Sequence, residues 1–73
     1  MQYFKTTQFV PQKGQAYMYI EASDADVVQR TLTFIPSTDE ISRIPDPVVK
    51  MLFMKERLTP CEGEEFLELW NKP

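Results

Sequence analysis

Two neighbouring stretches of strand-like sequence constrain the fold of this chain more than any other feature. Residues 15–22 (QAYMYIEA) and 27–36 (VVQRTLTFIP) are rich in the β-branched and aromatic side chains that suit a half-buried, pleated surface. Residues 23–26 (SDAD) lie between them and are small or acidic, which is typical of a hairpin loop. Because a lone two-stranded hairpin is marginally stable in water, another part of the chain must cover its apolar face.

Alternation along these stretches predicts which side chains share a face of the sheet. In the first stretch, an aliphatic set opposes a set with two aromatic rings: Met18, Ile20 and Ala22 against Tyr17, Tyr19 and Glu21. The predicted apolar face of the second stretch, which Arg30 interrupts, consists of Val28, Leu32 and Phe34. If the covering element packs on the aliphatic set, the two tyrosines point to solvent or to a partner.

The residues on either side of this hairpin predict further strands. Residues 1–10 alternate weakly and carry threonine and aromatic side chains, and the turn-forming residues 11–14 (PQKG) end this strand. Residues 41–44 are interpreted as a short edge strand, because Pro45 and Pro47 prevent its extension. The order of these strands along the chain predicts an antiparallel meander.

The C-terminal residues predict a helix. Thr59 is a suitable N-cap, Pro60 suits the first helical position, and the acidic Glu62 follows three residues after the cap. The helix then runs to Trp70, although Gly63 costs it about 0.8–1 kcal/mol relative to alanine. Its apolar stripe consists of Phe66, Leu69 and Trp70, with Leu67 at the border. This stripe is predicted to cover the apolar face of the hairpin.

The sequence between the edge strand and this helix allows more than one structure. Asp46 and Pro47 form a suitable helix start, so residues 48–52 are predicted to form one or two helical turns. The residues from Phe53 to Leu58 fit either a continuation of this helix or a strand, because periodicity does not distinguish the two over so short a span.

Together these elements predict a single small α+β domain spanning residues 1–73, with an antiparallel meander of about four strands and a C-terminal helix packed on one face. The lone cysteine, Cys61, cannot form an internal disulfide, so the domain must fold without covalent cross-links, which suits a reducing cytoplasm. No stretch approaches the ~18 apolar residues that span a bilayer, and the N-terminal residues lack the apolar region of a signal peptide.

The residue types argue against catalysis and against a metal site. The chain has no histidine, which removes the commonest general base and the partner that a catalytic serine needs. Cys61 is predicted at the second helical position, where the helix dipole lowers a thiol pKa, but neighbouring glutamates oppose this effect and an inert cysteine is favoured. The hairpin loop lacks calcium-loop spacing, although it brings together three carboxylates: Glu21, Asp24 and Asp26. No cofactor is predicted.

The charge pattern is acidic. The net charge is −3 and the sequence pI is about 4.8, which disfavours nucleic-acid binding. The predicted helix carries an acidic face, for which there are two interpretations. The carboxylates either imitate phosphate and occupy a basic groove of a nuclease or toxin, or they only stabilise the helix, through the helix dipole and through an i, i+4 pair between Glu68 and Lys72. The residues of this face are Glu62, Glu64, Glu65 and Glu68.

The candidate binding residues are Tyr17, Tyr19, Glu21, Arg30 and Arg43. Tyrosines on an open sheet face suit a protein interface, because they bury a large area at low entropic cost. Alternatively, they pack on cross-strand neighbours such as Thr31 and Thr33. Arg30 either extends from the edge of the core or binds a carboxylate.

Several motifs resemble a family of small bacterial proteins known only as a domain of unknown function. The matching residues are Tyr3, 30–34 (RTLTF), 44–47 (IPDP), 53–58, Thr59 and 66–70 (FLELW). The resemblance implies a strand meander with a C-terminal helix, favours a strand over residues 53–58, and implies no active site. The chain departs from the family pattern at Val28, where members often carry an acid, and after Pro47, where the segment is shorter.

These observations predict a small cytoplasmic binding or inhibitor protein without catalysis, such as an immunity protein or a phage-encoded anti-defence protein, with a protein partner. The alternative is an oligomeric protein that sequesters a small nucleotide-like ligand, with tyrosines stacking on a base and Arg30 or Arg43 binding a phosphate. Oligomeric state separates the two, because a 73-residue monomer offers little concave volume for a ligand.

Overall fold

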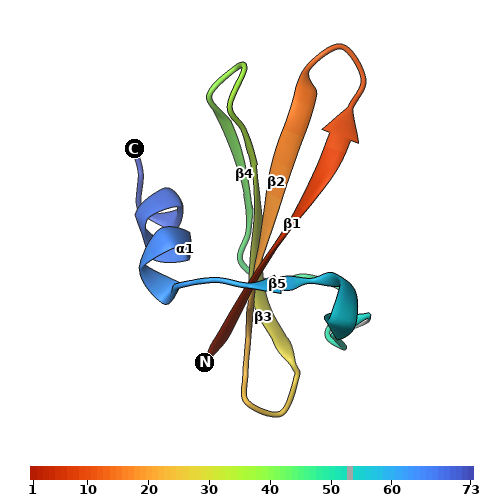
Figure 1. Ribbon diagram of the computed structural model, residues 1–73. Coiled ribbons are helices and arrows are strands. Elements are labelled where there is room, and N and C mark those ends of the chain that lie inside the picture. Colours follow the sequence, from red (N-terminus) through yellow and green to blue (C-terminus); the bar gives the residue numbers. More distant parts are fainter. Residues whose placement is uncertain (53) are drawn as a thin grey trace.

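An antiparallel sheet of five strands, in the order β4-β3-β2-β1-β5, forms the centre of the molecule (Figure 1). The computed structural model describes residues 1–52 and 54–73. The strands are β1 (Gln2–Val10), β2 (Gly14–Ala22), β3 (Val28–Ile35), β4 (Glu40–Ile44) and β5 (Thr59–Pro60). The predicted antiparallel meander is therefore confirmed for the first four strands, and the short β5 adds a strand beside β1.

A β-bulge changes the face to which the start of β3 belongs. Glu21 pairs with Arg30 and Ala22 pairs with Val28, so β3 has one residue more than β2 at this point. Val28 therefore turns to the face opposite Leu32. The prediction that these two side chains share a face is wrong, because simple alternation does not allow for the extra residue.

Two clusters of buried side chains lie on opposite faces of the sheet. The cluster beneath the helix α1 (Gly63–Trp70) consists of Tyr19, Leu32 and Phe66, and this side of the sheet is called the helix-covered face. The cluster on the other side, called the second face, consists of Phe4, Ile20 and Val28. Figure 1 shows α1 on one side of the sheet and the segment that leads to β5 on the other.

The helix covers the face opposite to the predicted one. The sequence-based prediction placed it over Met18 and Ile20 and left the tyrosines free, and this is wrong because Tyr19 is buried against Phe66. A tyrosine ring offers a large apolar area, and the hydroxyl of Tyr19 donates to Glu65, so the ring is buried without an unpaired polar group. The predicted stripe of the helix does pack on the sheet, through Phe66, Leu69 and Trp70.

An irregular segment after β4 covers the second face. The predicted helix over residues 48–52 is absent: Met51 forms an isolated bridge with Val27, and the backbone N–H of Val28 donates to the carbonyl of Lys50 at 2.6 Å. Pairing with the end of the β2–β3 loop and the start of β3 thus replaces helical hydrogen bonds in this segment. Leu52 packs against the cluster of the second face.

The ambiguous stretch before the last helix is neither a long helix nor a strand. A single 3₁₀ turn, η1 (Lys55–Arg57), occupies most of it, and Leu58 packs on the second face. The strand that the family resemblance favoured here is therefore wrong for residues 54–58, and Phe53 lies outside the described residues.

The predicted N-cap belongs to a strand instead. Thr59 and Pro60 form β5, which pairs with Lys5 and Phe4 of β1, and the N–H of Cys61 donates to the carbonyl of Tyr3 at 3.0 Å. Ladder hydrogen bonds to β1 therefore replace the local capping bonds at these residues. The helix begins at Gly63, three residues after Pro60, the predicted first helical position. Among the described residues, no helix is long and apolar enough to cross a membrane.

Gly63 allows the start of α1 to approach the ring of Tyr3. A Cβ atom at residue 63 would lie 2.8 Å from Cε2 of Tyr3, and the hydroxyl of that ring is held by a hydrogen bond to Glu21. The glycine that looked unfavourable for the helix is thus required by the packing between the helix and β1.

We expect Gly63→Ala to lower the free energy of unfolding by about 1–2 kcal/mol, because the added methyl group overlaps the Tyr3 ring even though alanine is the better helix former. Urea unfolding followed by circular dichroism measures this change. Glu64→Ala, in the same helical turn but exposed, is the matched control, with an expected change below about 0.5 kcal/mol. A Gly63→Ala variant at least as stable as the wild type would contradict the close packing.

Candidate functional site

An ion pair with a buried carboxylate and a half-buried guanidinium lies beside the rings of Phe66 and Trp70 of the helix. Arg30 donates from Nε and Nη2 to the two carboxylate oxygens of Glu21 at 2.7 and 2.8 Å, and the hydroxyl of Tyr3 donates to the same carboxylate at 2.8 Å. Glu21 is only 5% exposed, and the bonds from Arg30 hold the pKa of its carboxyl below the usual value. The guanidinium of Arg30 lies 4.6 Å from the centre of the Trp70 ring. Both residues are therefore engaged within the fold, and the carboxylate-bound alternative for Arg30 is confirmed.

A second polar cluster joins the helix to β1 and β2. Lys5 Nζ donates to Glu65 Oε1 at 3.0 Å, and the hydroxyl of Tyr19 donates to the same oxygen at 3.1 Å. Burial, followed by the charge of Glu65, raises the pKa of Tyr19 to about 12. The hydrogen bond to Glu65 also raises the pKa of Lys5. The tyrosine therefore keeps its proton, and Lys5 its positive charge, at neutral pH.

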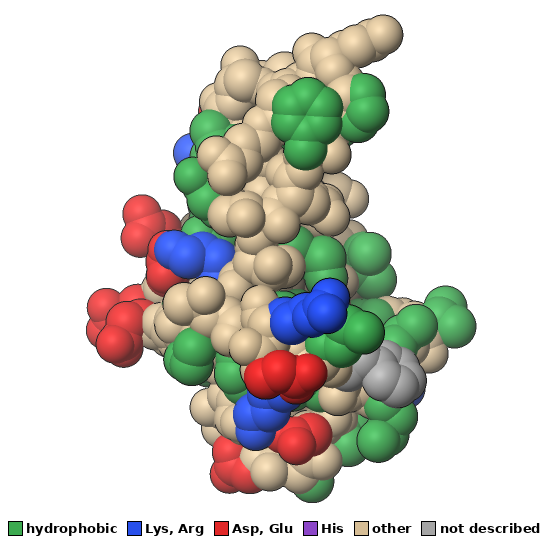
Figure 2. All heavy atoms as spheres, turned by 45° about the vertical axis from the view of Figure 1, so that its right-hand side comes forward, with side chains coloured by type: hydrophobic (Ala, Val, Ile, Leu, Met, Phe, Trp, Pro, Cys, Tyr) green, Lys and Arg blue, Asp and Glu red, His purple; other side chains and the backbone are tan. Residues whose placement is uncertain are grey.

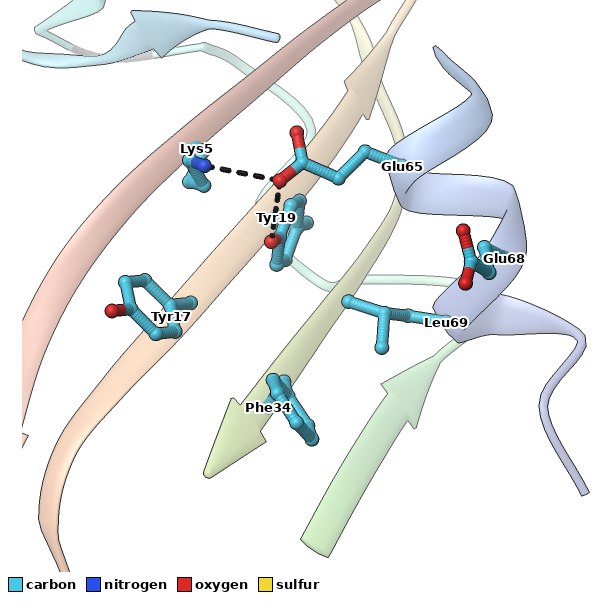
Figure 3. A pocket seen from close by; sticks show the side chains of 7 residues that line it. All are labelled: Lys5, Tyr17, Tyr19, Phe34, Glu65, Glu68 and Leu69. Atoms are coloured by element: carbon cyan, nitrogen blue, oxygen red, sulfur yellow. Dashed lines mark hydrogen bonds and ion pairs between the residues drawn. The ribbon is translucent and has the colours of Figure 1, made fainter. Parts of the chain in front are cut away.

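The remaining tyrosine of β2 lines an open pocket of about 340 Å³, shown in Figure 3. This pocket, called the tyrosine pocket, is lined by Lys5, Tyr17, Tyr19, Phe34, Glu65, Glu68 and Leu69. Tyr17 lies directly opposite Phe34 in the ladder between β2 and β3. The predicted packing of the tyrosines on Thr31 and Thr33 is wrong, because these threonines lie opposite Ile20 and Met18.

Arg43 stabilises the end of the helix. Its guanidinium donates to the carbonyl oxygen of Leu69 at 3.0 Å and also to that of Lys72. The carbonyl of Leu69 belongs to the last turn of α1, whose end carries partial negative charge, and that of Lys72 lies just beyond the helix. The structure therefore does not gather the five predicted binding residues into one free site. Of these five, only Tyr17 and Tyr19 line the tyrosine pocket, and among the side chains drawn in Figure 3 Tyr19 is bonded to Glu65 whereas Tyr17 makes no hydrogen bond.

The thiol of Cys61 is not activated by the helix. Cys61 precedes the helix, whose N-cap is Glu62, so the predicted position in the first helical turn is wrong. Burial, and next the charge of Glu65, raise the pKa of the thiol. A raised pKa leaves less of the reactive thiolate at neutral pH.

The carboxylates near the β2–β3 loop point to different partners. Asp26 accepts hydrogen bonds from Gln2 at 2.8 Å and from Lys55 at 3.1 Å, and Asp24 lies 3.4 Å from the N-terminal ammonium group. Glu21 is buried under the helix. Among the residues that the structure describes, no three metal-ligating side chains come together.

The second face carries an apolar groove of about 440 Å³, which the sequence-based reasoning did not find. Ile20 and Val28 line its floor, and Val48 and Met51 line its edge. Asp46 is the only charged residue among the described residues of its lining. The relevant signal was the four apolar side chains among residues 48–52 (VVKML), which were predicted to form one or two helical turns.

Large apolar side chains stand exposed around the apolar groove. Val48 is 97% exposed and Met51 is 60% exposed, and Val49 and Ile44 beside them are also exposed. Figure 2 shows hydrophobic side chains gathered on the lower right of the molecule. Exposed aliphatic side chains over an apolar hollow are typical of an interaction surface.

Comparisons of the chain with protein-family models, with curated proteins and with solved structures found no match. The resemblance to an uncharacterised bacterial family, which implies no active site, therefore stays a prediction.

Proposed function

We propose that this chain is a small, non-catalytic, cytoplasmic binding protein of the inhibitor or immunity type, as found in bacterial and phage conflict, and that it docks on a protein partner through the apolar groove. The observation that carries this proposal is the exposure of Val48 and Met51 over a groove whose described lining includes one charged residue. Leaving such side chains in water gives the isolated chain no benefit, whereas burial against a partner is favourable by about 25 cal/mol per Å² of apolar area.

The segment that presents these side chains is fixed to the sheet. Pro47 is buried, and the bonds of Lys50 to Val28, at the start of β3, and of Leu52 to Asp26, in the β2–β3 loop, hold the segment from its other end. A fixed apolar surface binds a partner without a large ordering cost. The flexible thioether side chain of Met51 also adapts to an irregular partner surface. These properties favour a protein partner over a compact ligand, which an open groove would leave partly in water.

The ligand-sequestering alternative has less support from the positions of its residues. It requires Arg30 or Arg43 to bind a phosphate, but Arg30 is bonded to Glu21 and Arg43 is bonded to the last turn of the helix. Catalysis has little support as well, since the chain has no histidine and burial raises the pKa of the Cys61 thiol.

We expect Val48→Asp to weaken partner binding by at least about 30-fold, because it places a charge within an apolar contact. The free energy of unfolding should change by less than about 0.5 kcal/mol, because the Val48 side chain is exposed. Affinity capture from the source organism, with quantitative mass spectrometry, identifies proteins retained by the wild type and lost with the variant, and calorimetry with the purified partner gives the affinity.

Phe9→Asp is the matched control, because Phe9 is 75% exposed but lies at the end of the β1–β2 hairpin, outside the groove. A partner lost equally with both variants, or retained by both, would contradict the proposed surface. Light scattering provides a further check, because it measures the oligomeric state. If the wild type formed a stable dimer that Val48→Asp dissociated, the groove would be a contact between two copies of this chain. This result would contradict the proposal that a different protein binds there.

A further inference from the structure

We propose that the tyrosine pocket binds the guanidinium group of an arginine side chain on a protein. The pocket lies on the helix-covered face, on the other side of the sheet from the apolar groove, so the two proposals stand on different residues.

The aromatic walls of the tyrosine pocket already attract cations of this chain. Lys5 Nζ lies 6.0 Å from the centre of the Tyr17 ring, and Lys72 Nζ lies 5.9 Å from the centre of the Phe34 ring. Both distances are within the range in which the face of an aromatic ring attracts a positive charge. Because the two rings lie opposite each other on neighbouring strands, they form two walls of the same pocket (Figure 3).

The charge of the pocket favours a cation from outside. Its lining contains two carboxylates and one ammonium group, and Lys5 is already paired with Glu65. Glu68 is exposed and makes no ion pair among the described residues, since Lys72, its predicted partner, lies 3.5 Å from Asp39 instead. Glu68 therefore supplies the uncompensated negative charge beside the aromatic walls.

The same face of the sheet already holds one arginine by the same combination of groups. Arg30 binds the carboxylate of Glu21 through two parallel hydrogen bonds and lies over the rings of Phe66 and Trp70, at 5.2 and 4.6 Å. A guanidinium is planar, stacks on rings and offers paired donors to a carboxylate, whereas an ammonium group is a compact, strongly hydrated charge. The carboxylate and rings of the tyrosine pocket therefore suit arginine better than lysine.

Titration of the labelled protein with a capped peptide, acetyl-Gly-Gly-Arg-Gly-Gly-amide, followed by nuclear magnetic resonance, tests this inference. We expect saturable shifts at Tyr17, Phe34 and Leu69, and binding at least about 5-fold weaker for the citrulline peptide, which keeps the shape without the charge. Free L-arginine, which adds a carboxylate and an α-ammonium group, should also bind more weakly, and tighter binding of the free amino acid would contradict a protein-borne ligand.

Two glutamates of one helix provide the matched pair of variants. Glu68→Gln should weaken peptide binding by about 5-fold or more, whereas Glu64→Gln, with the same charge change outside the pocket, should alter it by less than about 2-fold. Lys72→Gln should strengthen binding by about 2-fold, because it removes the cation that competes for the Phe34 ring. Equal effects of the two glutamate variants, equal binding of the citrulline peptide, or absence of saturable shifts would each overturn the inference, without bearing on the apolar groove.

Discussion

Replacing Phe66 with alanine is expected to lower the free energy of unfolding by about 3–5 kcal/mol, the largest effect of any single substitution considered for this chain. Phe66 is fully buried (0% exposed), and its ring lies 5.5 Å from that of Tyr3 and 5.7 Å from that of Trp70. The substitution leaves a cavity between the helix and the sheet. Since 73-residue domains have a total stability of roughly 4–11 kcal/mol, this loss removes a large share of it, and near the lower end of that range much of the variant would be unfolded at room temperature.

Urea unfolding followed by both tryptophan fluorescence and circular dichroism measures this loss. Leu67→Ala is the control, because Leu67 is the neighbouring residue but is 38% exposed and lies outside the buried cluster, so a loss of about 1 kcal/mol or less is expected. If the two variants were equally stable, the helix would not use the Phe66 side to cover the sheet.

Replacing Arg30 with methionine has the second-largest expected effect, a loss of about 2–4 kcal/mol. Methionine keeps much of the apolar stem of arginine but removes both donors to Glu21, which leaves a carboxylate that is 5% exposed without its charged partner. The loss is smaller than for a fully buried pair, because the Arg30 side chain is 28% exposed. The matched control is Lys13→Met, which removes an ion pair with Glu40 in which both side chains are exposed. This variant should lower the free energy of unfolding by less than about 1 kcal/mol.

The pH dependence of the Arg30→Met loss identifies its cause. In the wild type, Arg30 holds the pKa of Glu21 below the ordinary value of 4.5. The ion pair therefore stabilises the folded protein fully above that pH, and this stabilisation is lost as the pH falls through the lowered pKa. In the variant, burial acts on Glu21 without Arg30 and raises its pKa, so protonation relieves the penalty. The difference between wild type and variant should therefore shrink between about pH 7 and about pH 4. A constant difference would attribute the loss to packing alone.

Local sequence features predicted much of the architecture. The alternation in residues 15–22 and the SDAD loop predicted the β2–β3 hairpin, and the PQKG turn predicted the end of β1. The spacing of Phe66, Leu69 and Trp70 predicted the buried side of the helix. These features depend on residues near one another in the chain, where the periodicity of strands and helices is informative.

The errors came from interactions between distant segments. Alternation defines which side chains share a face, but it does not decide which face the helix covers, and bonds such as that from Tyr19 to Glu65 connect residues far apart in sequence. The pairing of Thr59 with Lys5 replaced a strong local capping signal. The apolar groove was missed for the same reason, since pairing of residues 50–52 with the β2–β3 loop and the start of β3 prevents the helix that the local sequence favours.

The position of the helix is the central claim, because both proposed binding surfaces depend on it. Nuclear Overhauser effects from the Phe66 ring test it most directly, since they report which side chains lie within about 5 Å. The fold predicts contacts from Phe66 to the methyl groups of Leu32 and to the ring of Tyr3. Contacts from Phe66 to the methyl groups of Ile20, on the second face, would contradict the account.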